Sequence, residues 1–258
     1  MAILRSFLII TLLLSVGGCV QTGGAETEGF KTPKADALPA VELEKILPGL
    51  WLHTSYQRLR NGVLYPSNGI VVRDGEHLLL VDPAWGAEAT KELLARIQLD
   101  IGLPVKHAIS THFHGDRTLG VDVLEETGVA VFAHPLTAEL AAAKGNPVPE
   151  HVFSDLARPG SHLTFGSVEV FYPGAAHARD NIMVWLPGQK VLYGGCALRE
   201  LSAKSLGNVK DADLSSWPVA VQRAKDRYSR AKLVVPGHGE VGSAELFDNM
   251  LQLFDDRK

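Results

Sequence analysis

The feature that most restricts the fold of this chain is its alternation of strand-like and helix-like segments. β-Branched and apolar tracts bounded by turn residues recur along the sequence, and the Asp74-Gly75 pair inside one of them predicts a tight hairpin. Between the tracts, apolar residues recur at helical spacing, as Leu93, Leu94 and Ile97 do. Strands are predicted at 49–56, 69–82, 105–110, 130–134, 162–172, 181–195 and 232–236, and helices at 87–99, 117–127, 135–144, 215–229 and 243–256. Hairpins mixed with crossover helices favour an α/β layered domain over an all-β barrel.

The composition fits one globular domain. Of the 258 residues, 46% are hydrophobic and 21% charged, and no Pro/Ser-rich linker divides residues 41–258. The formal net charge is −4, without a run of Lys/Arg. Because nucleic-acid phosphates demand clustered cations, this charge pattern argues against a nucleic-acid partner and favours a small-molecule substrate.

The N-terminus has the pattern of a processing signal. Arg5 precedes an apolar run over 7–16, which is too short to span a membrane as a mature helix. The VGGC run that ends at Cys19 resembles a bacterial lipobox, in which the cysteine becomes the lipidated first residue; plain secretion with cleavage elsewhere is the alternative. Residues 1–19 are therefore interpreted as a lipoprotein signal peptide. The polar, aperiodic residues 20–40 are predicted to be a flexible tether.

This interpretation predicts the location of the protein. The domain itself is expected to be soluble in the periplasm of a Gram-negative bacterium, with contact to a membrane only through the lipid on Cys19. Val20 rather than aspartate follows that cysteine, which in lipoproteins of this kind favours the outer membrane.

Cys196 is the second and last cysteine. Its one possible partner, Cys19, would be lipidated or removed with the signal, so no internal disulfide is available. An unpaired thiol in an oxidising compartment is a liability unless a metal holds it as thiolate. From the cysteine count alone, a metal ligand and an inert buried cysteine both remain open.

The stretch STHFHGDR over 110–117 follows a predicted strand. Extended residues at i and i+2 project to the same side, so His112 and His114 can reach one point, and a loop can turn Asp116 toward a second point nearby. Imidazole is a preferred zinc ligand. A solvated histidine pair is the alternative, and further ligands are needed to exclude it.

Three further candidate ligands follow other apolar runs and are flanked by Gly or Ala: His177, Cys196 and His238. Small neighbours let the backbone turn tightly and bring a side chain close to an ion. The six candidates are enough for two zinc ions, with His112, His114 and His177 as one site that keeps an open position and Asp116, Cys196 and His238 as another. The remaining histidines are interpreted as surface or core residues: His53, His77, His107, His134, His151 and His162.

These motifs resemble the metallo-β-lactamases, in particular subclass B1 and its Verona-type enzymes. The resemblance runs from about 47 to 239 through PGLW, YPSNG, DGEHLLLVDPAWG, STHFHGDR, VEVFYPGAAH, VLYGGCA, GNVKDADL and VVPGHG. It implies an αββα sandwich of two mixed β-sheets covered by helices, with two Zn²⁺ ions at one rim. It also implies a periplasmic enzyme, expected to be a monomer, that hydrolyses penicillins, cephalosporins and carbapenems and so confers antibiotic resistance. Arg117 supports the subclass, because thioesterase-like, phosphodiesterase-like and B3-type members usually carry histidine after the aspartate.

The resemblance implies a two-metal mechanism. An open zinc site lowers the pKa of bound water from 15.7 to about 7, so hydroxide can attack the lactam carbonyl while the second zinc stabilises the leaving nitrogen. Asp116 would bind the second zinc and orient the water. Asp82 is similar to the family's carboxylate that positions the metal ligands through hydrogen bonds, and Arg117 is assigned the same positioning role. The alternatives are a hydrolase of the same fold acting on thioesters or phosphodiesters, and a non-enzymatic zinc-binding lipoprotein.

The resemblance assigns the substrate contacts less directly. Arg199 occupies the position where many members have a lysine for the substrate carboxylate, whereas Verona-type enzymes use an arginine at the position that is Ala203 here. Arg199 is therefore the predicted anchor, with Lys204 as the alternative. Asn208 matches the asparagine near the lactam carbonyl, and Trp85 is predicted to line the pocket.

Two further positions depart from the family pattern. The hairpin over 56–69, which turns at Asn61-Gly62, is similar to the flap over the site, but Arg60 stands near its tip where an aromatic is common. Leu119 stands where relatives have glycine.

Overall fold

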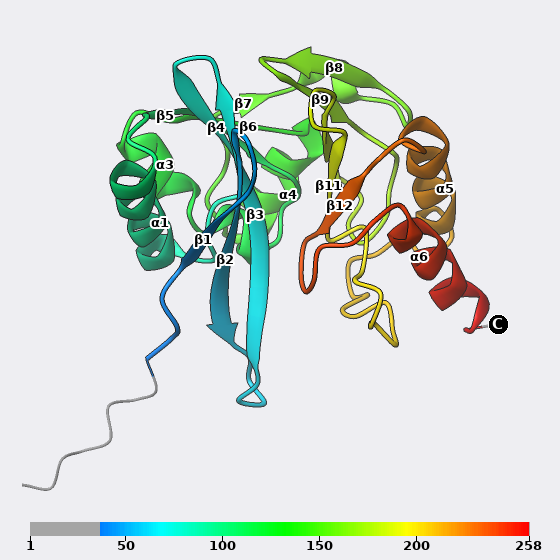
Figure 1. Ribbon diagram of the computed structural model, residues 1–258. Helices are drawn as coiled ribbons and strands as arrows, with labels where there is room; N and C mark the ends of the chain where they lie inside the picture. The colour runs from blue at the N-terminus through cyan, green and yellow to red at the C-terminus, as the bar shows by residue number, and fades with distance from the viewer. Residues whose placement is uncertain (1–36, 258) are drawn as a thin grey trace, which may run out of the picture. The chain divides into compact units, whose positions relative to one another are not determined.

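The computed structural model describes residues 37–257 (Figure 1). The predicted signal peptide and most of the tether lie outside these residues. From Leu38 onward the chain forms one compact unit, in which Leu38 to Ala40 are exposed and Val41 is the first buried residue. Among the described helices, none has the length and apolar character that crossing a membrane requires.

The unit contains two mixed β-sheets, as predicted. Sheet one has the order β1-β2-β3-β4-β5-β6-β7, and sheet two the order β12-β11-β10-β9-β8. The strands of sheet one are β1 (Glu42–Leu47), β2 (Leu50–Arg58), β3 (Leu64–Asp74), β4 (His77–Val81), β5 (Val105–Ser110), β6 (Ala130–Ala133) and β7 (His151–Val152). Those of sheet two are β8 (His162–Phe165), β9 (Val168–Phe171), β10 (Met183–Leu186), β11 (Val191–Gly195) and β12 (Leu233–Pro236). Pairing is antiparallel from β1 to β4 and from β8 to β11, and parallel from β4 to β7 and between β11 and β12.

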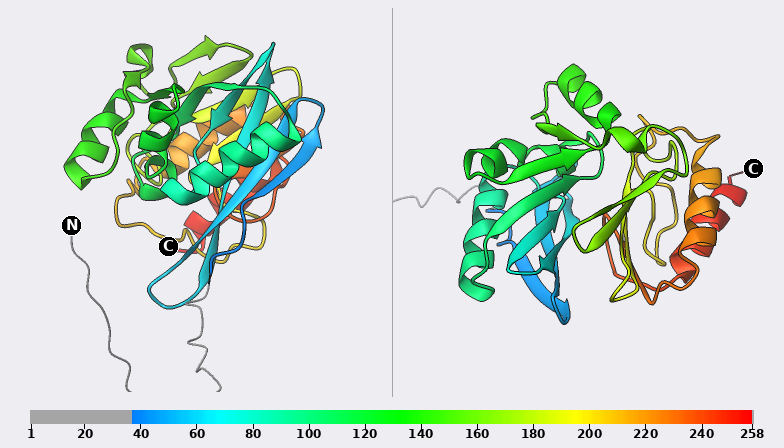
Figure 2. Two further views of the ribbon diagram at one scale, coloured as in Figure 1. Left: turned by 90° about the vertical axis from the view of Figure 1, so that its left-hand side faces the viewer. Right: turned by 90° about the horizontal axis from the view of Figure 1, so that it is seen from above.

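Both faces of each sheet are covered, which explains the continuous apolar runs in the strands. In β4, Leu79 and Val81 point into the core between the sheets, whereas Leu78 and Leu80 point outward and pack against helices. The outer layer of sheet one is made by α1 (Ala87–Asp100) and α3 (Val121–Glu126), and that of sheet two by α5 (Trp217–Arg227) and α6 (Glu245–Asp255). Figure 2 shows the resulting order of helix, sheet, sheet and helix, so the predicted αββα sandwich is confirmed.

The predicted helix over 117–127 is wrong in its continuity. The chain instead forms α2 (Gly115–Thr118) and α3, with a break at Leu119 and Gly120. A Cβ atom at Gly120 would overlap the side chains of Thr90 and Pro83. The backbone at Gly120 therefore lies too close to these residues for any side chain to fit at this position. The sequence period showed the helical residues but not this tertiary contact. The strand β1 was also missed, because its exposed and charged residues lack a clear alternating pattern.

Candidate metal centre

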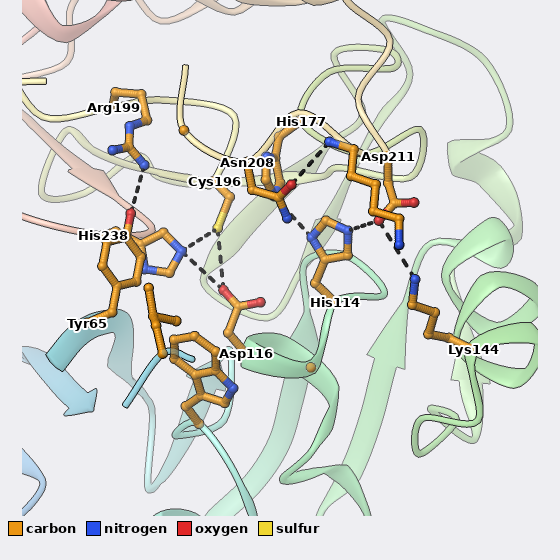
Figure 3. A pocket seen from close by; sticks show the side chains of 15 residues that line it. Tyr65, His114, Asp116, Lys144, His177, Cys196, Arg199, Asn208, Asp211 and His238 are labelled. Atoms are coloured by element: carbon orange, nitrogen blue, oxygen red, sulfur yellow. Dashed lines mark hydrogen bonds and ion pairs between the residues drawn. The ribbon is translucent and has the colours of Figure 1, made fainter. Parts of the chain in front are cut away.

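The six predicted ligands converge at one rim of the sandwich, where strands from both sheets end. His112 follows β5, His114 precedes α2, and Asp116 lies in its first turn. His177 lies in the connection from β9 to β10, Cys196 follows β11, and His238 follows β12. Four chain segments that are distant in sequence therefore supply donors to one place (Figure 3).

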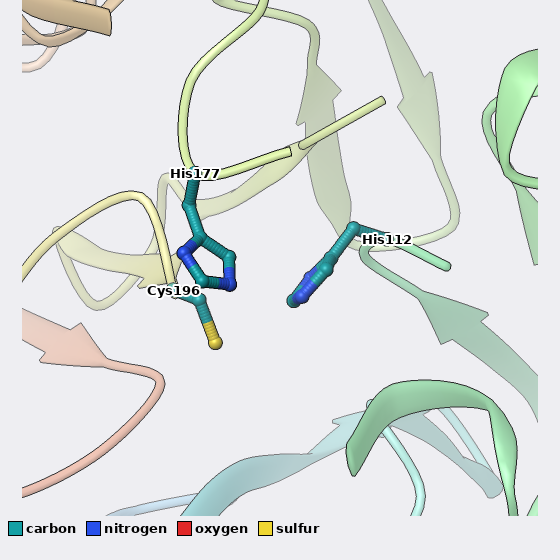
Figure 4. Close-up of side chains that lie close together, drawn as sticks. All are labelled: His112, His177 and Cys196. Carbon is teal, nitrogen blue, oxygen red and sulfur yellow. The ribbon is translucent and has the colours of Figure 1, made fainter. Parts of the chain in front are cut away.

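The three histidines of the first cluster bring their ring nitrogens together. His114 Nδ1 lies 3.1 Å from His112 Nε2 and 3.0 Å from His177 Nε2. Burial lowers the pKa of His177 to about 3 and holds the pKa of His112 well below its usual range, so both rings are neutral. Their lone pairs are therefore available to a cation. Figure 4 shows His112 and His177 beside Cys196 of the second cluster.

The second cluster carries negative charge. Cys196 Sγ lies 3.3 Å from His238 Nε2 and 3.6 Å from Asp116 Oδ2, and that oxygen lies 3.2 Å from His238 Nε2. Burial lowers the pKa of His238, but Cys196 and Asp116 outweigh burial and raise it to about 10. A group of donors that holds a proton this firmly favours positive charge at its centre.

Both clusters fit zinc. Zinc binds imidazole nitrogen at about 2.0–2.1 Å and thiolate at about 2.3 Å, which places two ligands of one tetrahedral ion roughly 3.3–3.6 Å apart. The donor separations of 3.0 to 3.6 Å are close to this spacing. Neutral imidazoles in one cluster and thiolate, carboxylate and imidazole in the other are also the donor types zinc prefers.

Acceptors on the outer side of the rings fix which nitrogen faces the centre. His114 Nε2 donates to Asp211 Oδ2 over 3.0 Å, and His238 Nδ1 donates to the Pro66 carbonyl over 2.6 Å. A carboxylate and a carbonyl can only accept, so in the neutral ring the opposite nitrogen carries the lone pair that faces the centre. A metal bound at His238 replaces the proton that its Nε2 otherwise holds. Asn68 holds the loop of His238 in place by donating to the carbonyls of Pro236 and Gly239.

Arg117 forms the floor below the second cluster. Its side chain is fully buried, and its guanidinium donates to Cys196 Sγ over 3.1 Å and to the Gly237 carbonyl over 2.8 Å. It also forms ion pairs with Asp116 and Asp82, at 3.1 and 3.3 Å. Burial raises the pKa of Asp116, but the charge of Arg117 and the hydrogen bond from His238 hold it well below its usual range.

Asp82 lies one layer further from the ligands. It adopts a left-handed backbone conformation at the end of β4 (φ 60°), which directs its carboxylate toward Thr111. The Thr111 amide and hydroxyl donate to it over 2.7 and 2.8 Å, and the Tyr193 hydroxyl donates over 2.8 Å. Asp82 therefore contacts the backbone just before His112 rather than a ligand itself, and it positions that segment.

A pocket of about 620 Å³ lies over the two clusters. At one end Arg199 Nη1 donates to the Tyr65 hydroxyl over 3.0 Å, and the Tyr65 ring packs 4.8 Å from that of His238. At the other end lie Asp211 and Lys144, whose Nζ is 4.0 Å from Asp211 Oδ2. The metal ligands lie between these ends (Figure 3).

The structure places the predicted substrate contacts unequally. Arg199, Asn208 and Trp85 line the pocket. Lys204 is exposed and is not among the lining residues. The Asn208 Oδ1 accepts from the Lys210 amide over 3.1 Å, which leaves its Nδ2 to donate elsewhere.

Sequence reasoning missed several lining residues: Leu59, Tyr65, Lys144, Lys210 and Asp211. Tyr65 and Asp211 lie inside the motifs YPSNG and GNVKDADL, which could have identified them. Lys144 ends the helix α4 (Pro135–Lys144) and carries no local signal, because only the fold brings that end to the pocket.

Arg60 and Leu119, the two positions that depart from the family pattern, differ in where they lie relative to the pocket. In the flap, Leu59 rather than Arg60 lines the pocket, so the hairpin still offers an apolar contact. Leu119 is 39% exposed, and its side chain lies against Gly115 at the edge of the pocket. Its φ of −66° needs no glycine, so the backbone tolerates leucine there.

Comparison with known proteins identifies the family. Residues 62–238 match the model of the metallo-beta-lactamase superfamily. The chain belongs to this superfamily. It is similar to a "metallo-beta-lactamase type 2" of Bacillus sp. (strain 170), with 39% identity over 93% of this chain and 97% of the relative. The type 2 relatives agree with the resemblance to subclass B1.

Solved structures agree with the sequence relatives. The metallo-β-lactamase from Pontibacter korlensis is 40% identical, with a TM-score of 0.78 over 84% of this chain and 99% of that one. The mono-zinc form of FIM-1 from Pseudomonas aeruginosa is 33% identical, with a TM-score of 0.80 over 85% of this chain and 96% of that one.

Proposed function

We propose that this metallo-β-lactamase is a zinc-dependent hydrolase that opens the amide bond of β-lactam antibiotics. The observation that carries the proposal is the pair of adjacent donor clusters at one rim of the sandwich, five of whose six residues line one pocket. When bound, zinc supplies a Lewis acid that makes a nucleophile from water at neutral pH and withdraws charge from the lactam. We infer that His112, His114 and His177 hold one ion and that Asp116, Cys196 and His238 hold a second.

The residues of the chain supply the positioning. The second carboxylate oxygen of Asp116 can accept a hydrogen bond from the attacking water and orient it. The free Nδ2 of Asn208 can donate to the lactam carbonyl oxygen as negative charge develops there. Asp211 and the Pro66 carbonyl keep His114 and His238 in the tautomers that bind metal.

The activity can be tested with a chromogenic cephalosporin, a penicillin and a carbapenem, each before and after dialysis against a chelator. We expect hydrolysis of all three, its loss on dialysis and its return with zinc. A hydrolase acting on thioesters or phosphodiesters would bind zinc but leave the carbapenem intact, and a zinc-binding lipoprotein would turn over none of them.

A Verona-type character within the subclass is also proposed from the motifs, and alignment against full-length Verona-type sequences tests it.

We infer that Arg199 binds the carboxylate common to these substrates. Its guanidinium lines the pocket beside the second cluster, and Tyr65 holds one of its nitrogens at 3.0 Å. Its buried Nε has no partner in the described part of the chain. A planar guanidinium with free donors suits a carboxylate. The exposed position of Lys204 outside the lining favours Arg199 over this alternative.

Arg199→Ala should therefore weaken binding of substrate and transition state alike, raising KM more than it lowers kcat. A charge-assisted hydrogen bond contributes roughly 1.5–3 kcal/mol, which corresponds to about ten- to a hundredfold in kcat/KM. Steady-state kinetics with metal analysis checks this, with Lys204→Ala as the matched control and Ala203→Arg added to Arg199→Ala to restore part of the loss. A silent Arg199→Ala together with an impaired Lys204→Ala would move the anchor to Lys204.

We also propose that the mature enzyme is a lipoprotein of the outer membrane, anchored through Cys19 in the periplasm. The lipobox-like run VGGC supports this. Fractionation of cells should find the wild type with the membranes and Cys19→Ala either released or unprocessed. Wild-type protein free in the periplasm would contradict the proposal.

A further inference from the structure

The end of the pocket that lies away from Arg199 carries two cations that the proposed mechanism does not use. Lys144, at the end of α4, lies there beside Asp211. Lys210, which directly precedes Asp211 in the loop before α5, also lines the pocket. Asp211 is the one carboxylate beside them in the described lining, and its Oδ2 already accepts from His114 over 3.0 Å. Two lysines against one engaged carboxylate leave this end with net positive charge.

Neither lysine is tied down by its neighbours. The Nζ of Lys144 is 4.0 Å from Asp211 Oδ2, at the limit of an ion pair, and its side chain is 47% exposed. Lys210 is exposed, and the contact that fixes its loop is made by its backbone amide to Asn208. Both ammonium groups therefore keep donors for a ligand.

The chemistry of a β-lactam determines which part of the substrate reaches this end. The ring carboxylate is carried by the carbon bonded to the lactam nitrogen, whereas the acyl side chain is carried by the carbon next to the carbonyl. The two substituents thus lie on opposite sides of the bond that is cleaved. Figure 3 shows Cys196 between Arg199 on one side and His114, Asp211 and Lys144 on the other. A substrate whose ring carboxylate binds Arg199 would therefore have its lactam nitrogen on the Cys196 side and its acyl side chain directed toward Asp211 and Lys144.

We propose that Lys144 and Lys210 form a second anion-binding subsite, selecting β-lactams whose acyl side chain carries its own carboxylate. This inference rests on the orientation set by Arg199 in the proposed function. Such substrates are dianions, with one charge for each cationic end of the pocket. A neutral acyl side chain would leave the two lysines hydrated.

Benzylpenicillin and its α-carboxy derivative are the matched probes, because they differ by one carboxylate on the acyl side chain. The measured quantity is the ratio of kcat/KM for the α-carboxy compound to that for benzylpenicillin, in zinc-saturated enzyme at low ionic strength. The variants are Lys144→Gln, Lys210→Gln and the double variant. Lys91→Gln is the control, because Lys91 is likewise an exposed lysine near a carboxylate, 2.7 Å from Glu88, but lies on α1 outside the pocket lining.

The double variant should lower the ratio about two- to tenfold, as expected for the loss of two exposed ion pairs, and each single variant should lower it less. High salt should reduce the wild-type ratio in the same direction, since exposed charges are screened over about 3 Å at 1 M. Lys91→Gln should leave the ratio unchanged. A fall in the ratio that is confined to the Lys144 and Lys210 variants supports the subsite.

Two outcomes would overturn it. An unchanged ratio in the double variant would show that the lysines do not contact the side-chain carboxylate. An equal fall in kcat/KM for both penicillins would mean that the two lysines only support Asp211 and His114. Arg199→Ala, measured on the same pair, tests the orientation separately, because loss of the ring anchor lowers both values and leaves the ratio in place.

Discussion

The two metal clusters rest on buried floors that are built in opposite ways. Below Asp116, Cys196 and His238, the fully buried Arg117 contacts donors of the cluster directly and pairs with Asp82. On the side of the three-histidine cluster, a buried carboxylate, Asp180, contacts the backbone of Phe113, between His112 and His114, and accepts from the Thr137 hydroxyl over 2.7 Å. Asp180 forms no ion pair among residues 37–257, and its carboxylate is hydrogen-bonded only by neutral groups there, the Thr137 hydroxyl and the backbone of Asp180 and Phe113.

This difference follows the charge of the ligands. Thiolate and carboxylate carry negative charge into a buried site, so a permanent cation beneath them offsets part of their desolvation. Neutral imidazoles need no such cation. The comparison indicates that Arg117, below the second cluster, supports both protein stability and metal binding. The buried carboxylate of Asp180 instead lowers the free energy of unfolding.

Replacing Arg117 should give the largest effect. Arg117→Met keeps most of the volume but leaves Asp82 buried beside Tyr193 without its cation, which costs about 3–5 kcal/mol in the free energy of unfolding. Denaturant unfolding in the presence of a chelator measures this without the contribution of zinc. Arg227→Met is the matched control, because Arg227 pairs with Glu169 at 2.9 Å near the surface and should cost less than about 1 kcal/mol. Equal losses in the two variants would show that the buried Arg117 contributes no more to stability than a surface ion pair.

Replacing Cys196 tests whether the clusters bind metal independently. In Cys196→Ser a neutral hydroxyl replaces the thiolate, so affinity for the second ion should fall by about a hundredfold or more, while the first ion stays. Metal analysis at graded zinc concentration follows both ions, and Ser205→Ala on a nearby loop serves as a control outside the clusters. Equal loss of both ions would show that the ligands are not divided as proposed.

The sequence predicted one part of this contrast and not the other. The ligands follow strands and have small neighbours, so His112, His177, Cys196 and His238 could be identified from local pattern. Arg117 and Asp82 were found through a family resemblance. Asp180 gave no signal, because its burial depends on packing against Thr137, 43 residues away. The same limit applies to Lys144 and to the break at Gly120: both depend on contacts that the fold creates between distant segments.

Asp180 should give the smallest effect, and one of opposite sign. Burial raises its pKa to about 6, although the Thr137 hydroxyl stabilises the ionised form. The unfolded value is about 3.9. A carboxyl whose pKa is higher in the folded state binds its proton more tightly there, so the folded protein loses stability as pH rises from about 4 to about 6.

Asp180→Asn removes this cost and should make the protein more stable at pH 7.5 by roughly 1–3 kcal/mol, relative to its effect at pH 4. The difference between the two pH values is the informative quantity, because any change in hydrogen bonding to Thr137 contributes at both. Asp213 provides an opposite control: a hydrogen bond from the Ser215 side chain lowers its pKa, so Asp213→Asn should lose stability toward neutral pH. Unfolding measured at both pH values, at fixed zinc concentration, checks the two variants together. A pH-independent effect of Asp180→Asn would mean that the carboxylate carries no such cost, and the contrast between the two floors would then rest on Arg117 alone.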